Sequence, residues 1–133
     1  MTDDQIKEQR LELLKDPGWR ALLTIFCGIL LRRNELVWKH VDLEARSIDI
    51  EKLLDDAGVL SGGEKRMVNI ALSLFSHGCE VNLYRVLSNL DEENAQLVID
   101  AIGTFLFPDV TMFRGNETAI QKVLVEKPVR KRT

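Results

Sequence analysis

The segment that most constrains the fold covers residues 59–75 and reads V-L-S-G-G-E-K-R-M-V-N-I-A-L-S-L-F. Ser61 is a favoured N-cap residue and Glu64 stands three positions later, so the two side chains can form a capping box at the start of a helix. Apolar side chains then recur at the spacing of one helical face, at Met67, Ile70, Ala71, Leu74 and Phe75. We therefore predict a helix that begins at Ser61 and packs this face against the rest of the chain.

Helix signals recur on both sides of this segment. Asp16 stands before a proline, Asp49 opens I-E-K-L-L-D-D-A, and Asp91 stands before two glutamates, so each aspartate is a predicted N-cap. Further predicted helices cover residues 4–14, 17–31, 34–42, 50–57 and 91–107, with a shorter one over 83–87. The helix over 91–107 has an apolar stripe of Leu97, Val98, Ala101, Ile102, Phe105 and Leu106. Gly58 and Gly78 are predicted to take the left-handed conformation just past helix ends.

The C-terminal region fits more than one structure. Residues 109–113 can be a short extended piece, and residues 118–126 can be a helix or a strand, because V-L-V favours a strand while its flanks permit a helix. Residues 127–133 carry four basic residues and form a predicted basic tail.

The sequence thus predicts an all-α or mainly α fold, a compact bundle of about five to six helices with room for a short extended C-terminal piece. We assign residues 1–126 to a single helical domain and residues 127–133 to the tail.

Composition and charge narrow the classes of function. The chain is 45% hydrophobic and 29% charged, as in globular proteins, and its net charge of −3 does not favour nucleic acid. Cys27 and Cys79 are predicted free thiols, because two cysteines and two histidines at these positions form neither a disulfide framework nor a zinc cluster. The N-terminus M-T-D-D-Q-I-K-E has no signal-peptide pattern, and the apolar run at 22–31 is much shorter than the roughly 20 residues of a membrane span. We predict a cytoplasmic protein without a membrane segment, metal or cofactor.

The letters L-S-G-G-E-K at residues 60–65 resemble the signature segment of the ATP-binding-cassette ATPases, most closely their chromosome-maintenance and DNA-repair branch. This resemblance implies that Ser61 and the glycines after it contact the γ-phosphate of a nucleotide held on an opposite subunit. Holding that nucleotide requires a P-loop, G-x-x-x-x-G-K-[ST], which the sequence lacks. Gly58 and Gly63 have the spacing of the two P-loop glycines. The next residue is Glu64, however, where the motif requires a lysine, and Lys65 follows one position after it. We therefore interpret residues 61–64 as a helix cap.

Four segments together resemble another family. They are D-P-G-W-R-A-L at 16–22, N-E-L-V-W-K-H at 34–40, S-G-G-E-K at 61–65 and L-D-E-E-N at 90–94. The family consists of small helical proteins, without an assigned activity, that are encoded by Firmicutes and their prophages and mobile elements. The resemblance implies a helical fold and brings neither a reaction nor site residues with it.

The sequence shows no convincing nucleophile–base pair, phosphate loop or metal cluster, and we assign no catalytic residue. Our first hypothesis is a non-catalytic interaction module that binds another protein. If a mobile element encodes the chain, we expect that partner to be a host or defence protein. One alternative is nucleic-acid binding through the basic residues Arg32, Arg33, Lys39, Lys127, Arg130, Lys131 and Arg132. Another is a remnant or partner of a cassette ATPase. The oligomeric state is left open.

Overall fold

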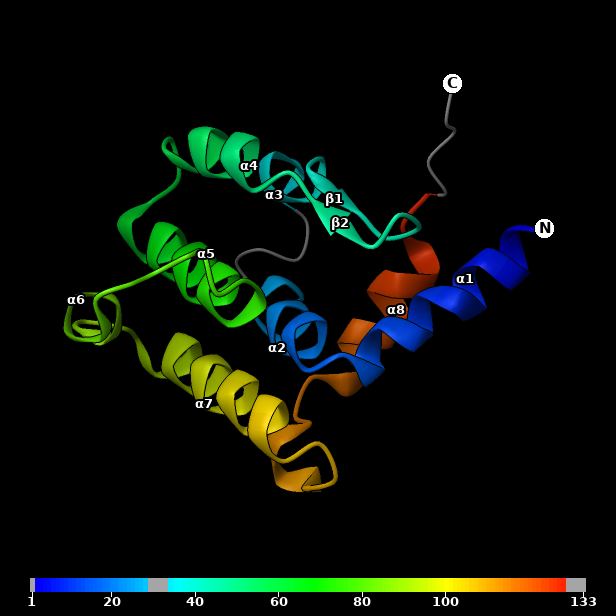
Figure 1. The fold of residues 1–133 in the computed structure, drawn as a ribbon. Helices are drawn as coiled ribbons and strands as arrows, with labels where there is room; N and C mark the ends of the chain where they lie inside the picture. Colours follow the sequence, from blue (N-terminus) through cyan, green and yellow to red (C-terminus); the bar gives the residue numbers. More distant parts are fainter. Residues whose placement is uncertain (1, 29–33, 129–133) are drawn as a thin grey trace.

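The computed structural model describes residues 2–28 and 34–128 of the 133-residue chain (Figure 1). This part is mainly helical, which confirms the predicted fold class, but it holds eight α-helices instead of five to six. They are α1 (Asp3–Leu11), α2 (Pro17–Phe26), α3 (Glu35–Trp38), α4 (Ile50–Ala57), α5 (Gly62–Phe75), α6 (Leu83–Leu87), α7 (Glu92–Leu106) and α8 (Glu117–Glu126). The short 3₁₀ helices η1 (Glu12–Lys15) and η2 (Thr111–Phe113) and the strands β1 (Val41–Asp42) and β2 (Ser47–Ile48) complete the described elements.

Helix α2 lies at the centre of the fold, where it packs against α5 and α7 (Figure 1). Eight of its ten residues are buried, and Leu22, Leu23 and Phe26 are fully covered. Helix α1 runs beside α8, and α3 packs against α4. The first half of the apolar run at 22–31 is thus a buried helix, as predicted. Helix α2 ends at Phe26, however, and residues 29–33 lie outside the described part of the chain.

The four N-caps predicted at Asp16, Asp49, Ser61 and Asp91 are confirmed. The side chains of Asp16, Asp49, Ser61 and Asp91 each accept a hydrogen bond, of 2.7 to 3.2 Å, from the backbone N–H three residues later. At α5, Glu64 Oε1 accepts in turn from the Ser61 hydroxyl at 2.8 Å and from the Ser61 N–H at 3.4 Å, which completes a capping box. Helix α5 then lies in the core with five buried side chains, those of Met67, Val68, Ile70, Ala71 and Leu72.

A β-hairpin replaces the second half of the helix predicted over residues 34–42. The helical part is limited to α3, and Val41 then pairs with Ile48 in an antiparallel register. The turn is closed by Asp42, whose Oδ1 accepts from the Ala45 N–H at 2.9 Å, and by Arg46, whose φ is 56°. Arginine rarely adopts this left-handed conformation. The turn has no glycine or asparagine, the residues that usually signal a hairpin, so the sequence does not indicate it.

The described glycines form no left-handed turns, and at Gly103 the missing side chain gives space for close packing. No described glycine has a positive φ, and Gly58 continues the right-handed turn of α4 with a φ of −57°, so the predictions for Gly58 and Gly78 are wrong. At Gly103, by contrast, an added Cβ would lie 2.2 Å from Cγ of Phe113. Because Gly103 has no side chain, η2 can pack directly on α7.

Residues 109–126 contain η2 and α8, which are joined by turns, and η2 forms where the sequence allowed a short extended piece. Helix α8 buries Ile120, Val123 and Leu124 on one side. Burial of that side outweighs the preference of V-L-V for a strand.

Candidate interaction surfaces

The basic residues predicted from the sequence are described only in part, since Arg32, Arg33, Arg130, Lys131 and Arg132 lie outside the described residues. Lys39 Nζ lies 2.8 Å from a carboxylate oxygen of Asp56. Lys127 Nζ lies 3.6 Å from a carboxylate oxygen of Glu35 and 4.7 Å from the centre of the Trp38 ring. Each of these two lysines thus has a carboxylate partner, and binding of nucleic acid stays a prediction.

Asp56 joins α4 to the residues that follow α3. Its Oδ2 accepts from Lys39 Nζ at 2.8 Å and lies 2.6 Å from His40 Nε2. Asp56 thus has two partners that can carry positive charge. The hydrogen bonds from Lys39 and then from His40 hold the pKa of Asp56 below its usual value.

This pKa shift predicts a dependence of stability on pH. A carboxyl group with a lowered pKa in the folded state stabilises the fold above its unfolded pKa, and this stabilisation is lost as the pH falls through the folded pKa. We expect the wild-type melting temperature to fall more between about pH 5 and about pH 3 than that of an Asp56→Asn variant. Thermal melts followed by circular dichroism at both pH values measure this difference. An equal fall in both proteins would contradict the role of Asp56.

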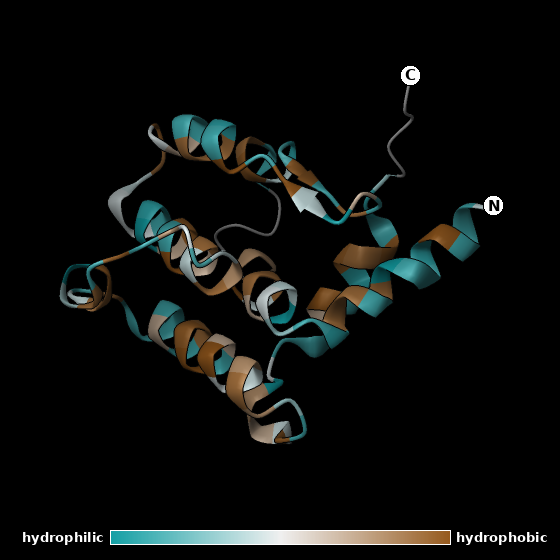
Figure 2. Cartoon of the chain, in the orientation of Figure 1, coloured by the Kyte–Doolittle hydropathy of each residue, from teal (hydrophilic) through white to brown (hydrophobic). Residues whose placement is uncertain are grey.

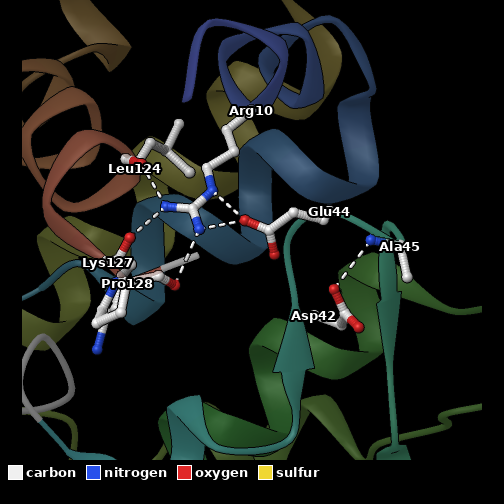
Figure 3. A network of polar contacts seen from close by, with 7 residues as sticks. All are labelled: Arg10, Asp42, Glu44, Ala45, Leu124, Lys127 and Pro128. Atoms are coloured by element: carbon white, nitrogen blue, oxygen red, sulfur yellow. Dashed lines mark hydrogen bonds and ion pairs between the residues drawn. The ribbon is translucent and has the colours of Figure 1, made fainter. Parts of the chain in front are cut away.

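Arg10 forms a buried polar network that the sequence does not indicate (Figure 3). Arg10 is 2% exposed. Its Nε donates to Glu44 Oε1 at 2.7 Å, and its Nη2 also donates to this oxygen. Nη1 donates to the carbonyls of Leu124 and Lys127 at 2.9 and 2.6 Å, and Nη2 donates to that of Pro128 at 3.0 Å. All five N–H donors of the guanidinium are therefore used. They join α1 to the hairpin turn and to the C-terminal end of α8, where helix carbonyls need donors.

Helix α7 is rich in apolar residues (Figure 2), and part of its apolar stripe is exposed. Val98 and Ala101 are buried as expected, but Ile99, Ile102 and Leu106 are 53%, 39% and 59% exposed. Together with the half-buried Ala95 they follow one another at intervals of four, three and four residues, so they lie on one side of the helix. The predicted apolar stripe is therefore only partly buried, since Ile102, Phe105 and Leu106 are exposed.

The exposed apolar residues continue past the C-terminal end of α7. Phe107, Val110 and Met112 are 54%, 37% and 75% exposed. The Phe107 ring stacks on Phe113 with a centroid distance of 6.4 Å, which holds this segment against the helix. The name α7 surface is used below for six residues, Ile99, Ile102, Leu106, Phe107, Val110 and Met112.

A cleft of about 560 Å³ lies next to the end of this surface, between η1, α2, the C-terminal end of α7 and the start of α8. Its apolar wall is formed by Leu14, Pro17, Phe105, Phe113 and Ile120. Three cationic side chains also line it, those of Lys15, Arg20 and Arg114, together with the carboxylates of Asp109 and Glu117. The cleft thus combines an apolar wall with a small excess of positive charge.

Among the described residues, no group of three or more histidine, cysteine or acidic side chains lies close enough to hold a metal ion. The helices of the same part of the chain are too short or too polar to span a bilayer. Comparison with models of known protein families gives no match, and comparison with curated proteins and with solved structures gives no significant match. The two resemblances suggested by the sequence therefore stay predictions.

Proposed function

We propose that the chain is a non-catalytic protein–protein interaction module whose α7 surface binds an amphipathic helix of another protein. The proposal is carried by the exposure of Ile99, Ile102 and Leu106 along one side of a 15-residue helix. Single exposed apolar residues are ordinary on protein surfaces. A row at intervals of three and four residues has the spacing at which two helices pair.

The length and charge of α7 define the chemistry of the partner. A helix of 15 residues is about 22 Å long, which gives room for about two heptads of a partner helix. Helix α7 contains no lysine or arginine, and Asp91, Glu92 and Glu93 are exposed at its start. A complementary partner carries apolar residues at heptad spacing and lysine or arginine beside these carboxylates.

The polar networks of the molecule support a non-catalytic role. The Arg10 network, the contacts of Asp56 and the N-caps each join structural elements of the fold. The proposal also includes the nature of the partner, which we place among host or defence proteins because the sequence resembles proteins of prophages and mobile elements.

The test is affinity capture from a host lysate with quantitative mass spectrometry, using three forms of the full chain. The first is the wild type, the second carries Ile102→Glu and Leu106→Glu, and the third is the matched control Val59→Glu. Val59 is 78% exposed in the connection between α4 and α5, away from the α7 surface. We expect the double variant to lose at least about thirtyfold in affinity for the captured partner, as for central interface residues. The control should bind like the wild type.

Two outcomes would contradict the proposal. The first is capture of the same partner with equal yield by all three forms. The second is a wild-type chain that sediments as a dimer which the double variant dissociates, because the α7 surface is then covered by a second copy. Circular dichroism should show both variants folded, since substitutions at exposed sites usually change stability by less than about 0.5 kcal/mol.

A further inference from the structure

The cleft beside η1 has a property that the proposed function does not explain, because its arginines have no carboxylate partner. Arg20 donates from Nε and Nη2 to the Thr104 carbonyl at 2.8 and 2.6 Å, and from Nη1 to the Leu14 carbonyl at 2.9 Å. Arg114 donates from Nε and Nη2 to the Pro108 carbonyl. Within the described part of the chain, neither guanidinium forms an ion pair with a carboxylate. Each is thus held in place by backbone oxygens, and the nearby carboxylates of Asp16 and Asp109 act on Arg20 only as weaker, longer-range charges.

Unused donors remain on both side chains. A guanidinium has five N–H groups. Arg20 uses three of them, so two remain, and Arg114 uses two, so three remain. Arg20 and Arg114 line the same cleft, and burial and then the charge of Arg114 hold the pKa of Arg20 below its usual value, although Asp16 and Asp109 act in the opposite direction. An anion between them would relieve this repulsion and use the free donors.

The rest of the cleft favours an apolar molecule. Its volume of about 560 Å³ lies within the range of ligand pockets, roughly 300–1,000 Å³. Side chains of Leu14, Phe105, Phe113 and Ile120 form much of the wall. Free inorganic ions would leave this wall exposed to water, whereas an apolar body would cover it.

We propose that this cleft binds a small amphiphilic anion, that is, an apolar body that ends in a carboxylate. The carboxylate lies at Arg20 and Arg114, and the apolar body lies against Phe105, Phe113 and Ile120. The carboxylates of Asp109 and Glu117 at the cleft limit its positive charge, so they weaken anion binding. The inference goes beyond the proposed function and does not depend on it, since the helix-binding residues of the α7 surface are a different set.

Octanoate is a suitable probe. Octan-1-ol is a control with a chain of the same length but no charge, and acetate is a control with the carboxylate but no long apolar chain. Calorimetric titration of the full chain should show octanoate binding at least about tenfold more tightly than either control, because a charged hydrogen bond and apolar burial act together. Arg114→Gln should weaken octanoate binding about tenfold. Glu117→Gln should strengthen it, and Arg85→Gln, at an exposed residue of α6, should leave it unchanged.

The opposite signs at positions 114 and 117 separate binding from folding, because a general loss of structure would weaken binding in both variants. Octanoate affinity equal to that of octan-1-ol would overturn the inference, and so would a change of the same sign in both variants. Capture of a partner through the α7 surface could still succeed in either case, so the two proposals fail separately.

Discussion

Replacement of Arg10 by methionine should lower the free energy of unfolding by about 3–5 kcal/mol, the usual cost of removing one partner from a buried ion pair. Methionine keeps much of the apolar stem but has no donor. The Glu44 carboxylate, whose side chain is 14% exposed, and the carbonyls of Leu124, Lys127 and Pro128 would each lose the guanidinium. For a chain of this length the melting temperature should fall by roughly 10–20 °C.

Urea unfolding of Arg10→Met and of a matched control, Arg85→Met, measures this effect. Arg85 is exposed on α6, so its replacement should change stability by less than about 0.5 kcal/mol. Arg10→Lys keeps the charge but has one nitrogen in place of a planar fork, so it should recover only part of the loss. If Arg10→Met unfolds at the same urea concentration as Arg85→Met, the network does not stabilise the fold.

The parts of the fold that depend on local chemistry could be predicted from the sequence. Asp16, Asp49, Ser61 and Asp91 cap helices because a short polar side chain reaches a backbone N–H three residues away, an interaction contained within one turn. The buried face of α5 follows from the helical period in the same way. For these elements the sequence contains both partners of each interaction within a few residues.

The Arg10 network could not be predicted because its partners are distant in sequence. Glu44 lies 34 residues from Arg10, and the accepting carbonyls lie 114 to 118 residues away. Within I-K-E-Q-R-L, Arg10 resembles the other charged residues of a solvated helix. The hairpin could not be predicted for a related reason, since Arg46 takes its left-handed conformation in the turn that joins β1 to β2.

The exposed side of α7 shows a further limit of periodicity. The spacing of apolar residues indicates which of them share a side of a helix, but not whether another element covers that side. Helix α7 packs against α2 and buries Val98 and Ala101, while Ile99, Ile102 and Leu106 remain exposed. Because the sequence alone suggests one core stripe, the candidate interaction surface became visible only in the structure.

The position of α2 at the centre of the core leads to the second large effect, which we expect at Phe26. This ring is fully buried and meets Trp38 of α3 edge to face, with a centroid distance of 5.9 Å and an interplanar angle of 74°. Phe26→Ala should cost about 3–5 kcal/mol, because it removes buried apolar area and leaves a cavity where α2 and α3 meet.

Phe107→Ala is the matched control for Phe26→Ala, since Phe107 is 54% exposed and stacks only on Phe113 among the ring pairs described here. Its loss should cost less than about 1 kcal/mol. Phe26→Leu is a second variant at the same site, with an expected cost below about 1.5 kcal/mol. It should stay folded, because natural domains have a free energy of unfolding of about 5–15 kcal/mol. In urea unfolding, Phe26→Ala should have a lower free energy of unfolding than both Phe26→Leu and Phe107→Ala. If Phe26→Ala and Phe107→Ala lower the free energy of unfolding equally, α2 is not the centre of the core.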